Sequence, residues 1–334
     1  MKLCQMVRLG KASRLQACRT RCAALYYRLE TCPSAAMATT TNKITVSSLQ
    51  SKKERGQKIC MLTAYDYPTA ALQDEAGLDV ILVGDSVGTN VLGYRGPQQV
   101  TMDDILHHLR AVRRAVRRAF LLADLPFMSF QPSVETAVKN AGRLVQEGGA
   151  EGVKLEGGLP VLPQLKAIVD AGIPVVGHLG FTPQSQAREF YLFSDRRGTV
   201  PKFHGKGPKG AKALVEQALR LEDAGAFALV LELVTEEAAQ AVAERLKIPV
   251  IGIGAGRYCD GQVLIVHDLV GLNEEDLILT KAYGQTRQNW LEMFKTYCRE
   301  VAEGRFPTAE NTAHMAPEKR AQLDQLLNDN GKNR

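Results

Sequence analysis

Eight short apolar segments alternate with longer segments of helical periodicity between residues 58 and 303. Each apolar segment is too short for a helix and is rich in branched side chains, as in strands buried on both faces of a parallel sheet. The predicted strands are residues 58–64, 80–83, 120–123, 152–155, 174–176, 226–231, 249–253 and 263–266. Eight strand–helix units predict an α/β fold of the (β/α)₈ TIM-barrel type, with an open doubly wound sheet as the alternative.

Caps and apolar stripes predict the helices between these strands. Asp66 is placed to cap a helix that has Pro68 in its first turn and runs to Glu75, and Ser133 to cap another. Further helices are predicted at residues 101–118, 133–145, 159–170, 211–223, 236–246 and 280–303. Residues 181–210 are irregular, which in a compact domain often indicates a lid, and residues 305–334 are polar and predicted to be extended.

The basic excess of the chain lies at its N-terminus. Residues 1–36 hold seven Lys and Arg against one Glu, which accounts for the whole formal net charge of +6. The rest is formally neutral and has no run near the roughly 20 apolar residues of a membrane span, so we expect neither nucleic-acid nor membrane binding. We predict a disordered basic extension at 1–42, a catalytic barrel at 43–315 and a polar tail at 316–334.

The extension has two interpretations. It is either a mitochondrial transit peptide or sequence upstream of a misassigned start, and the second is favoured because Met37 begins a natural-looking N-terminus. The protein is accordingly expected in the cytoplasm, or in mitochondria if the extension is a transit peptide. The seven cysteines form no Cys-x-x-Cys pair, which indicates a reducing compartment without a disulfide framework or a zinc site.

Five successive predicted strands, the second to the sixth, are followed by a carboxylate or an imidazole. These residues are Asp85, Asp124, Glu156, His178 and Glu232. Because strand ends of a barrel meet at one mouth, we expect the five side chains to lie around one site. Carboxylates from three adjacent strands would suit a hard cation such as Mg²⁺. Lys154 shares the side of its strand with Glu156 and could face an anionic substrate.

Each of these residues has a plainer explanation when taken alone. A strand-end Asp often caps the next helix, a strand Lys often extends to solvent, and His178 could be a satisfied core residue. Glu is a poor cap, however, so capping does not explain Glu156 and Glu232. The joint pattern therefore favours a functional site.

Seven separated motifs closely resemble those of the ketopantoate hydroxymethyltransferase family, in the family's order, from about residue 44 to residue 314. They are Thr-Ala-Tyr-Asp at 63–66, Val-Gly-Asp-Ser at 83–86, Leu-Ala-Asp-Leu-Pro-Phe at 122–127, Val-Lys-Leu-Glu-Gly at 153–157, Gly-His-Leu-Gly-Phe-Thr-Pro-Gln at 177–184, Leu-Val-Leu-Glu at 229–232, and Ile-Pro-Val-Ile-Gly-Ile-Gly-Ala-Gly at 248–256 with Asp-Gly-Gln at 260–262. The segment 193–203 is longer and more charged than is usual in that family.

The resemblance implies a (β/α)₈ barrel that assembles as a homodecamer. It implies transfer of a hydroxymethyl group from 5,10-methylenetetrahydrofolate to 3-methyl-2-oxobutanoate, giving 2-dehydropantoate for pantothenate and coenzyme A biosynthesis. Matched by motif, the Mg²⁺ ligands would be Asp85, Asp124 and Glu156. The oxo acid would contact Asp85, Ser86, Asp124 and Lys154. Glu232 would be the proton acceptor, with His178 supporting the site.

The implied chemistry agrees with the residue types. Removing the C3 proton of a 2-oxo acid produces an enolate, which a divalent cation stabilises and a carboxylate base can generate. One alternative is a metal-dependent 2-oxo-acid lyase of the isocitrate-lyase type, which would be expected to carry a Lys-Lys-Cys-Gly loop that this sequence lacks. The other is a non-catalytic barrel, which would have no need of three carboxylates together with Lys154 and Glu232.

Overall fold

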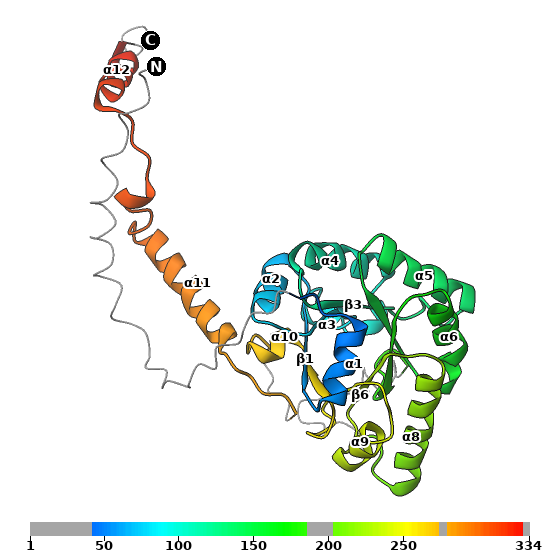
Figure 1. The fold of residues 1–334 in the computed structure, drawn as a ribbon. Helices are drawn as coiled ribbons and strands as arrows, with labels where there is room; N and C mark the ends of the chain where they lie inside the picture. The colour runs from blue at the N-terminus through cyan, green and yellow to red at the C-terminus, as the bar shows by residue number, and fades with distance from the viewer. Residues whose placement is uncertain (1–41, 186–202, 274–278, 330–334) are drawn as a thin grey trace, which may run out of the picture. The chain divides into compact units, whose positions relative to one another are not determined.

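Eight parallel strands close into a barrel in the order β1 to β8, with β8 paired to β1 (Figure 1). The computed structural model describes residues 42–185, 203–273 and 279–329. The strands are β1 (Ile59–Thr63), β2 (Val80–Val83), β3 (Phe120–Asp124), β4 (Gly152–Glu156), β5 (Val175–Gly180), β6 (Ala228–Glu232), β7 (Val250–Ile253) and β8 (Gly261–Leu264). The predicted TIM barrel is thus confirmed, and the open-sheet alternative is wrong.

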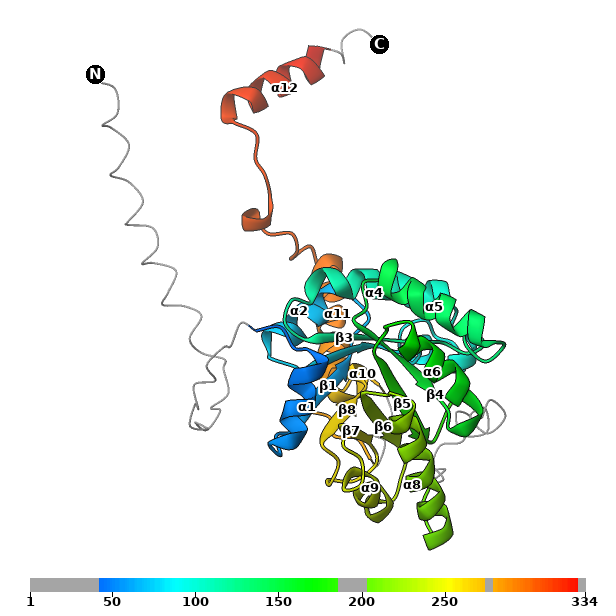
Figure 2. The same ribbon diagram turned by 45° about the vertical axis from the view of Figure 1, so that its right-hand side comes forward.

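The helices that connect the strands surround the barrel (Figure 2). The helices are α1 (Val46–Glu54), α2 (Tyr67–Glu75), α3 (Val87–Asn90), α4 (Met102–Ala115), α5 (Val134–Gln146), α6 (Leu162–Asp170), α8 (Pro208–Asp223), α9 (Glu236–Ala243), α10 (Val266–Leu269), α11 (Thr286–Ala302) and α12 (Pro317–Asp329), with 3₁₀ turns η1 (Pro97–Gln99), η2 (Leu159–Val161) and η3 (Ala309–Asn311). The predicted caps are confirmed: the side chain of Asp66 accepts from the Thr69 N–H of α2, and that of Ser133 accepts from the Thr136 N–H of α5.

Several predicted boundaries differ from the structure. The C-terminal segment was expected to be extended, but α12 is helical, because strong helix formers such as Glu, Lys, Gln and Leu follow Pro317 at its first position. Strand β8 ends at Leu264 rather than two residues later, and α11 begins after Gly284, which is a poor helix former. Helix α1 was not predicted, since Leu49 is its only buried residue. The extension before residue 42 and the loop interior at 186–202 lie outside the described residues.

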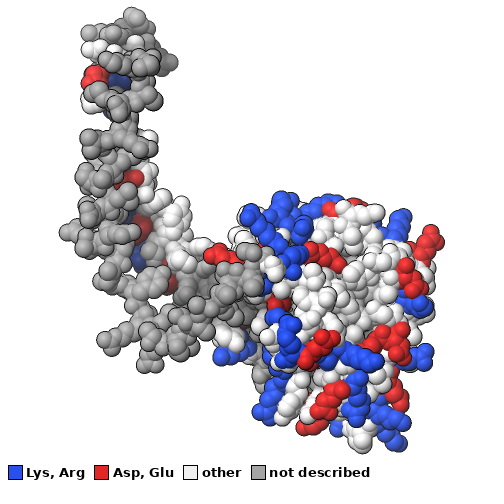
Figure 3. All heavy atoms as spheres, viewed as in Figure 1, with Lys and Arg blue, Asp and Glu red and all other residues white. Residues whose placement is uncertain are grey.

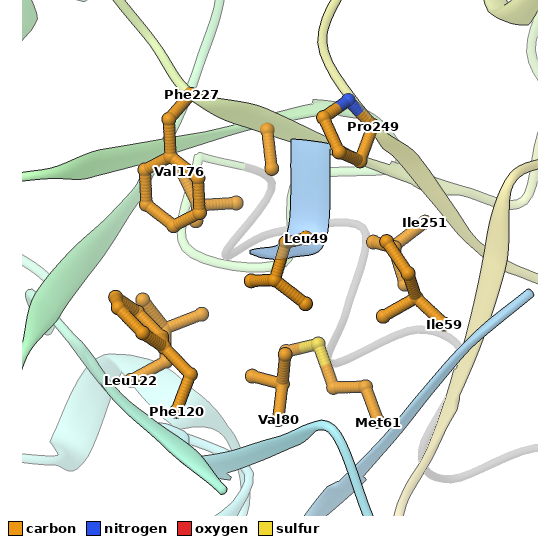
Figure 4. A pocket seen from close by; sticks show the side chains of 11 residues that line it. Leu49, Ile59, Met61, Val80, Phe120, Leu122, Val176, Phe227, Pro249 and Ile251 are labelled. Atoms are coloured by element: carbon orange, nitrogen blue, oxygen red, sulfur yellow. The ribbon is translucent and has the colours of Figure 1, made fainter. Parts of the chain in front are cut away.

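The N-terminal end of the barrel is closed by apolar side chains. Inward-facing residues of the strands form one buried cluster, to which α1 contributes Leu49. Figure 4 shows Leu49 among the side chains that line a cavity of about 20 Å³. The chain enters at this end, where Ile44 N donates to Arg118 O and the Lys43 ammonium pairs with Glu151 at 2.6 Å, just ahead of β3 and β4. We call this the closed end of the barrel.

The outer faces of β1 and β8 are less covered than those of the other strands. Cys60 and its register partner Gln262 are exposed, and Leu62 and Leu264 are only half-buried, whereas every residue of β2, β3 and β4 is buried. Helix α11 is the long helix that follows β8, yet none of its residues is buried. Helix α11 therefore buries none of its side chains against the barrel.

The surface of the barrel carries charges of both signs. Figure 3 shows Lys and Arg interspersed with Asp and Glu over the visible face. On α4, Arg110 pairs with Glu147 of the loop after α5 at 2.9 Å. This mixture agrees with the neutral charge of the chain beyond its N-terminal region. In the part of the chain that the structure describes, no helix is long and apolar enough to cross a membrane.

Candidate active site

Strand alternation places the polar residues at the end of the barrel opposite the closed end. Because successive side chains of a strand point to opposite faces, an inward position recurs every second residue. In β3 and β6 the inward positions nearer the closed end are apolar. The last inward position is Asp124 in β3 and Glu232 in β6. In β4 the two inward positions nearest the mouth are Lys154 and Glu156. In β5 the corresponding residue is His178, which lies inside the strand and not beyond its end as predicted.

Asp85 and Ser86 reach the same place from the turn after β2. The Asp85 N–H donates to Oδ2 of Asp124 at 3.1 Å, which joins β2 to β3. A Cβ on Gly84 would lie 3.1 Å from both that oxygen and the Ser86 hydroxyl, so glycine permits this close approach. The Ser86 hydroxyl is in turn 2.8 Å from the hydroxyl of buried Tyr65. Tyr65 belongs to the motif at residues 63–66, but it is not among the predicted site residues.

Lys154 and Asp124 form a buried ion pair between neighbouring strands. The Nζ–Oδ1 distance is 2.9 Å, and both side chains are almost fully buried. Burial raises the pKa of Asp124 to about 6. The nearby charge of Lys154 lowers this pKa, and the nearby charge of Asp85 raises it further. Burial likewise raises the pKa of Asp85, although Lys154 opposes the rise. The Lys154 pKa lies above its ordinary value, because its three carboxylate neighbours outweigh its burial.

His178 bridges two carboxylates. Its Nδ1 is 3.3 Å from Glu156, and its Nε2 is 3.3 Å from Glu232. Burial and the nearby Lys154 oppose the positive form, but the contacts with the two glutamates outweigh both and raise the His178 pKa to about 9. Among the described residues, Glu232 is thus paired with an imidazole.

Glu232 is more accessible than Asp124 and Glu156. Its side chain is 23% exposed, whereas those of Asp124 and Glu156 are 2% exposed. Leu233, the next residue, has φ of 49°, a left-handed conformation that is uncommon for a branched side chain. Strained backbone of this kind clusters at active sites and ligand clamps, where the surrounding structure holds it in place. Glu232 is thus fixed by backbone and by His178 while remaining open to solvent.

Gln184 connects two of the carboxylates, although it is not among the site residues predicted from the sequence. Its backbone N–H donates to Glu156 at 2.6 Å, and its side-chain amide donates to Asp85 at 2.7 Å. A loop amide gives no chemical signal in a sequence, and the only hint was its place at the end of the motif at residues 177–184. With Gln184 included, every predicted site residue belongs to one connected group at the mouth of the barrel.

The donor set fits a divalent cation. The group combines four carboxylates with one ammonium and one imidazole, namely Asp85, Asp124, Glu156, Glu232, Lys154 and His178. With all four carboxylates ionised, negative charges exceed positive ones by two even when the imidazole is protonated, and oxygen donors suit Mg²⁺. Among the described residues, no three His, Cys, Asp or Glu side chains are arranged as a ready-made metal site. The ligand assignment therefore stays a prediction.

Comparisons with known proteins point to one family. The model of the ketopantoate hydroxymethyltransferase family matches residues 43–309. A 3-methyl-2-oxobutanoate hydroxymethyltransferase from Acetivibrio thermocellus is 48% identical over 272 residues, which cover 81% of this chain and 93% of the relative. One from Clostridium kluyveri is 49% identical over 274 residues, covering 82% and 95%.

Solved structures resemble the fold at much lower identity. A phosphoenolpyruvate phosphomutase from Streptomyces platensis subsp. rosaceus has a TM-score of 0.52 at 15% identity, covering 86% of this chain and 97% of its own. A phosphonopyruvate hydrolase in complex with oxalate and Mg²⁺ has a TM-score of 0.50 at 15% identity, covering 85% and 96%. These similarities support the barrel fold alone.

Proposed function

The chain belongs to the ketopantoate hydroxymethyltransferase family, and we infer that it is an enzyme that transfers a hydroxymethyl group to 3-methyl-2-oxobutanoate. We propose that the donor is 5,10-methylenetetrahydrofolate and that water supplies the hydroxyl oxygen. The products are then 2-dehydropantoate and tetrahydrofolate, and the reaction serves pantothenate and coenzyme A biosynthesis. The observation that carries the proposal is the connected group of carboxylates, Lys154 and His178 at the barrel mouth.

The residues that would hold Mg²⁺ are Asp85, Asp124 and Glu156. A bound cation would supply Lewis-acid stabilisation of the negative charge that develops on the oxo acid. Lys154 holds Asp124 in place through the buried ion pair and contributes positive charge toward an anionic substrate. Ser86, fixed by Tyr65, would offer its hydroxyl to the same substrate together with Asp85.

Glu232 is the group proposed to take the C3 proton. A base must be accessible to the substrate yet held in one orientation, and Glu232 meets both conditions. His178 holds Glu232 through Nε2 and Glu156 through Nδ1, so one imidazole links the proposed base with a proposed metal ligand. The C3 carbanion equivalent then forms the new C–C bond with the one-carbon unit. Both bonds from that carbon to the folate nitrogens break, water supplies its hydroxyl group, and the C3 proton and the remaining proton of water end on the nitrogens of tetrahydrofolate.

The direct test is formation of 2-dehydropantoate by the purified chain. With 3-methyl-2-oxobutanoate, methylenetetrahydrofolate and Mg²⁺ present, we expect product; after chelation with EDTA we expect loss of the reaction, restored by excess Mg²⁺. Omitting the folate is the matched control and should also stop it. Cleavage of 2-oxo-acid adducts without folate would instead favour the lyase alternative, and unchanged turnover after chelation would contradict the metal assignment.

We also propose that the active form is a homodecamer in the cytoplasm. Supporting the assembly, α11 exposes apolar and aromatic side chains, and the outer faces of β1 and β8 are less covered than those of the other strands. The exposed residues of α11 include Trp290, Met293, Phe294 and Tyr297. Exposed apolar patches of this kind commonly mark contacts between protein chains.

Changing two aromatic residues of α11 should therefore weaken the assembly. Trp290→Ser combined with Phe294→Ser removes large apolar side chains that are 46% and 60% exposed, and we expect a smaller particle by size-exclusion chromatography with light scattering. Lys295→Ser on the same helix is the matched control and should leave the molar mass unchanged. An unaltered molar mass in the double variant would show that this face makes no subunit contact.

A further inference from the structure

We propose that Gln184 is a positioning residue for the cation site, whose amide groups hold Asp85 and Glu156 in the arrangement that a divalent cation needs. The inference rests on the proposed function, since it takes these two carboxylates as metal ligands. Nothing in the chemistry of a glutamine side chain suggests this role, and it follows only from the contacts that the fold creates.

Gln184 reaches the two carboxylates with different groups. Its backbone N–H donates to Oε1 of Glu156 at 2.6 Å, and its side-chain Nε2 donates to Oδ2 of Asp85 at 2.7 Å and to Leu125 O at 3.1 Å. The residue is only 1% exposed. One residue from the loop after β5 thereby joins the ends of β2, β3 and β4, the three strands that carry the proposed ligands.

The orientation of this amide is set by its surroundings. Gln131 Nε2 donates to the Gln184 Oε1 at 3.3 Å, so the carbonyl side of the amide faces Gln131 and the NH₂ side faces Asp85. The preceding carbonyl, of Pro183, accepts from the Gln98 side chain. Gln98 therefore anchors the same loop without contacting a carboxylate, which distinguishes anchoring of the loop from positioning of the ligands.

A neutral donor is well suited to this place. Two carboxylates close to each other repel, and hydrogen bonds from a neutral amide stabilise their charged forms without adding a positive charge that would compete with the cation. Gln184 uses one oxygen of Asp85, and no hydrogen bond among the described residues reaches the other, Oδ1. That oxygen stays available to a metal ion. Partners of this kind, which orient a ligand from outside the metal's coordination sphere, typically alter metal affinity 10–100-fold when removed.

The test measures binding of Mn²⁺ alone to the full chain, from the electron paramagnetic resonance signal of the free ion. Gln184→Met keeps the length of the side chain and removes the donor, so we expect Mn²⁺ binding about 10–100-fold weaker. Gln98→Leu is the matched control and should bind Mn²⁺ as the unaltered chain does. Thermal denaturation of each variant reports whether the fold is kept.

The outcomes separate this inference from the proposed function. If the unaltered chain does not bind Mn²⁺, the metal assignment itself is wrong. If it binds, and Gln184→Met binds equally well or loses only what Gln98→Leu loses, then Gln184 does not position the ligands. Should Gln184→Met fail to fold, Gln184→Asn is measured instead, because its amide is one methylene too short to reach Asp85 and the same weakening is expected.

Discussion

Glu232→Gln is expected to slow exchange of the C3 proton of 3-methyl-2-oxobutanoate into deuterated water by about 10²–10⁴-fold, the usual contribution of a positioned base. The amide has the shape of the carboxylate but cannot accept the proton. Binding of the oxo acid and of the cation should stay nearly intact, because the proposed ligands lie on other strands. Proton nuclear magnetic resonance of the substrate in deuterated buffer with Mg²⁺ measures the exchange without the folate.

A second glutamate provides the control for this experiment. Glu236 at the start of α9 pairs with Arg257 at 3.1 Å and does not contact the group at the mouth, so Glu236→Gln should exchange the proton at the original rate. Exchange at the original rate in Glu232→Gln would show that Glu232 is not the base. His178, which contacts Glu232 directly, would then be the next candidate.

Lys154→Met is expected to lower the free energy of unfolding by about 3–5 kcal/mol, because breaking one side of a buried ion pair leaves an uncompensated buried charge. Lys154 is the only ammonium of the group at the mouth, and its partner Asp124 is 2% exposed. Methionine keeps much of the side chain's volume, so the loss reports the charge rather than a cavity. Urea denaturation followed by circular dichroism measures the change, with Mg²⁺ removed by EDTA.

Removing the partner charge as well should restore part of this stability. Asp124→Asn combined with Lys154→Met takes away both ends of the pair, and we expect the double variant to be more stable than Lys154→Met alone. The exposed pair between Lys166 and Asp170 supplies the comparison, since Lys166→Met should cost at most about 1 kcal/mol. A loss in Lys154→Met no larger than that of Lys166→Met would mean that the buried pair does not stabilise the fold.

Much of the barrel and of its mouth could be predicted because both depend on local patterns. Short apolar runs indicate strands, and a two-residue spacing places Lys154 and Glu156 on one side of β4, as observed. His178 lies within β5 and not beyond a strand end, because Gly177, a residue that commonly ends a strand, is accommodated inside this buried one. The convergence at the mouth followed from the fold class rather than from any single residue.

The rest depends on packing between distant segments, which a local pattern does not contain. Gln184 acquires its importance only when the loop after β5 folds over β2 and β4, and the sequence distance to Asp85 is 99 residues. Helical periodicity likewise predicts that a helix such as α11 exists but not which surface it covers. For that reason the smaller cover on the outer faces of β1 and β8 became apparent only in three dimensions.

The entry of the chain at the closed end has a practical consequence. Lys43 and Ile44 are tied to the segments just ahead of β3 and β4, a full strand length from Asp124 and Glu156. An affinity tag, a fluorescent reporter or a surface attachment placed ahead of residue 43 is therefore joined to the barrel on the side away from its mouth. Immobilised through an attachment ahead of residue 43, the protein would present the mouth of its barrel to the solution.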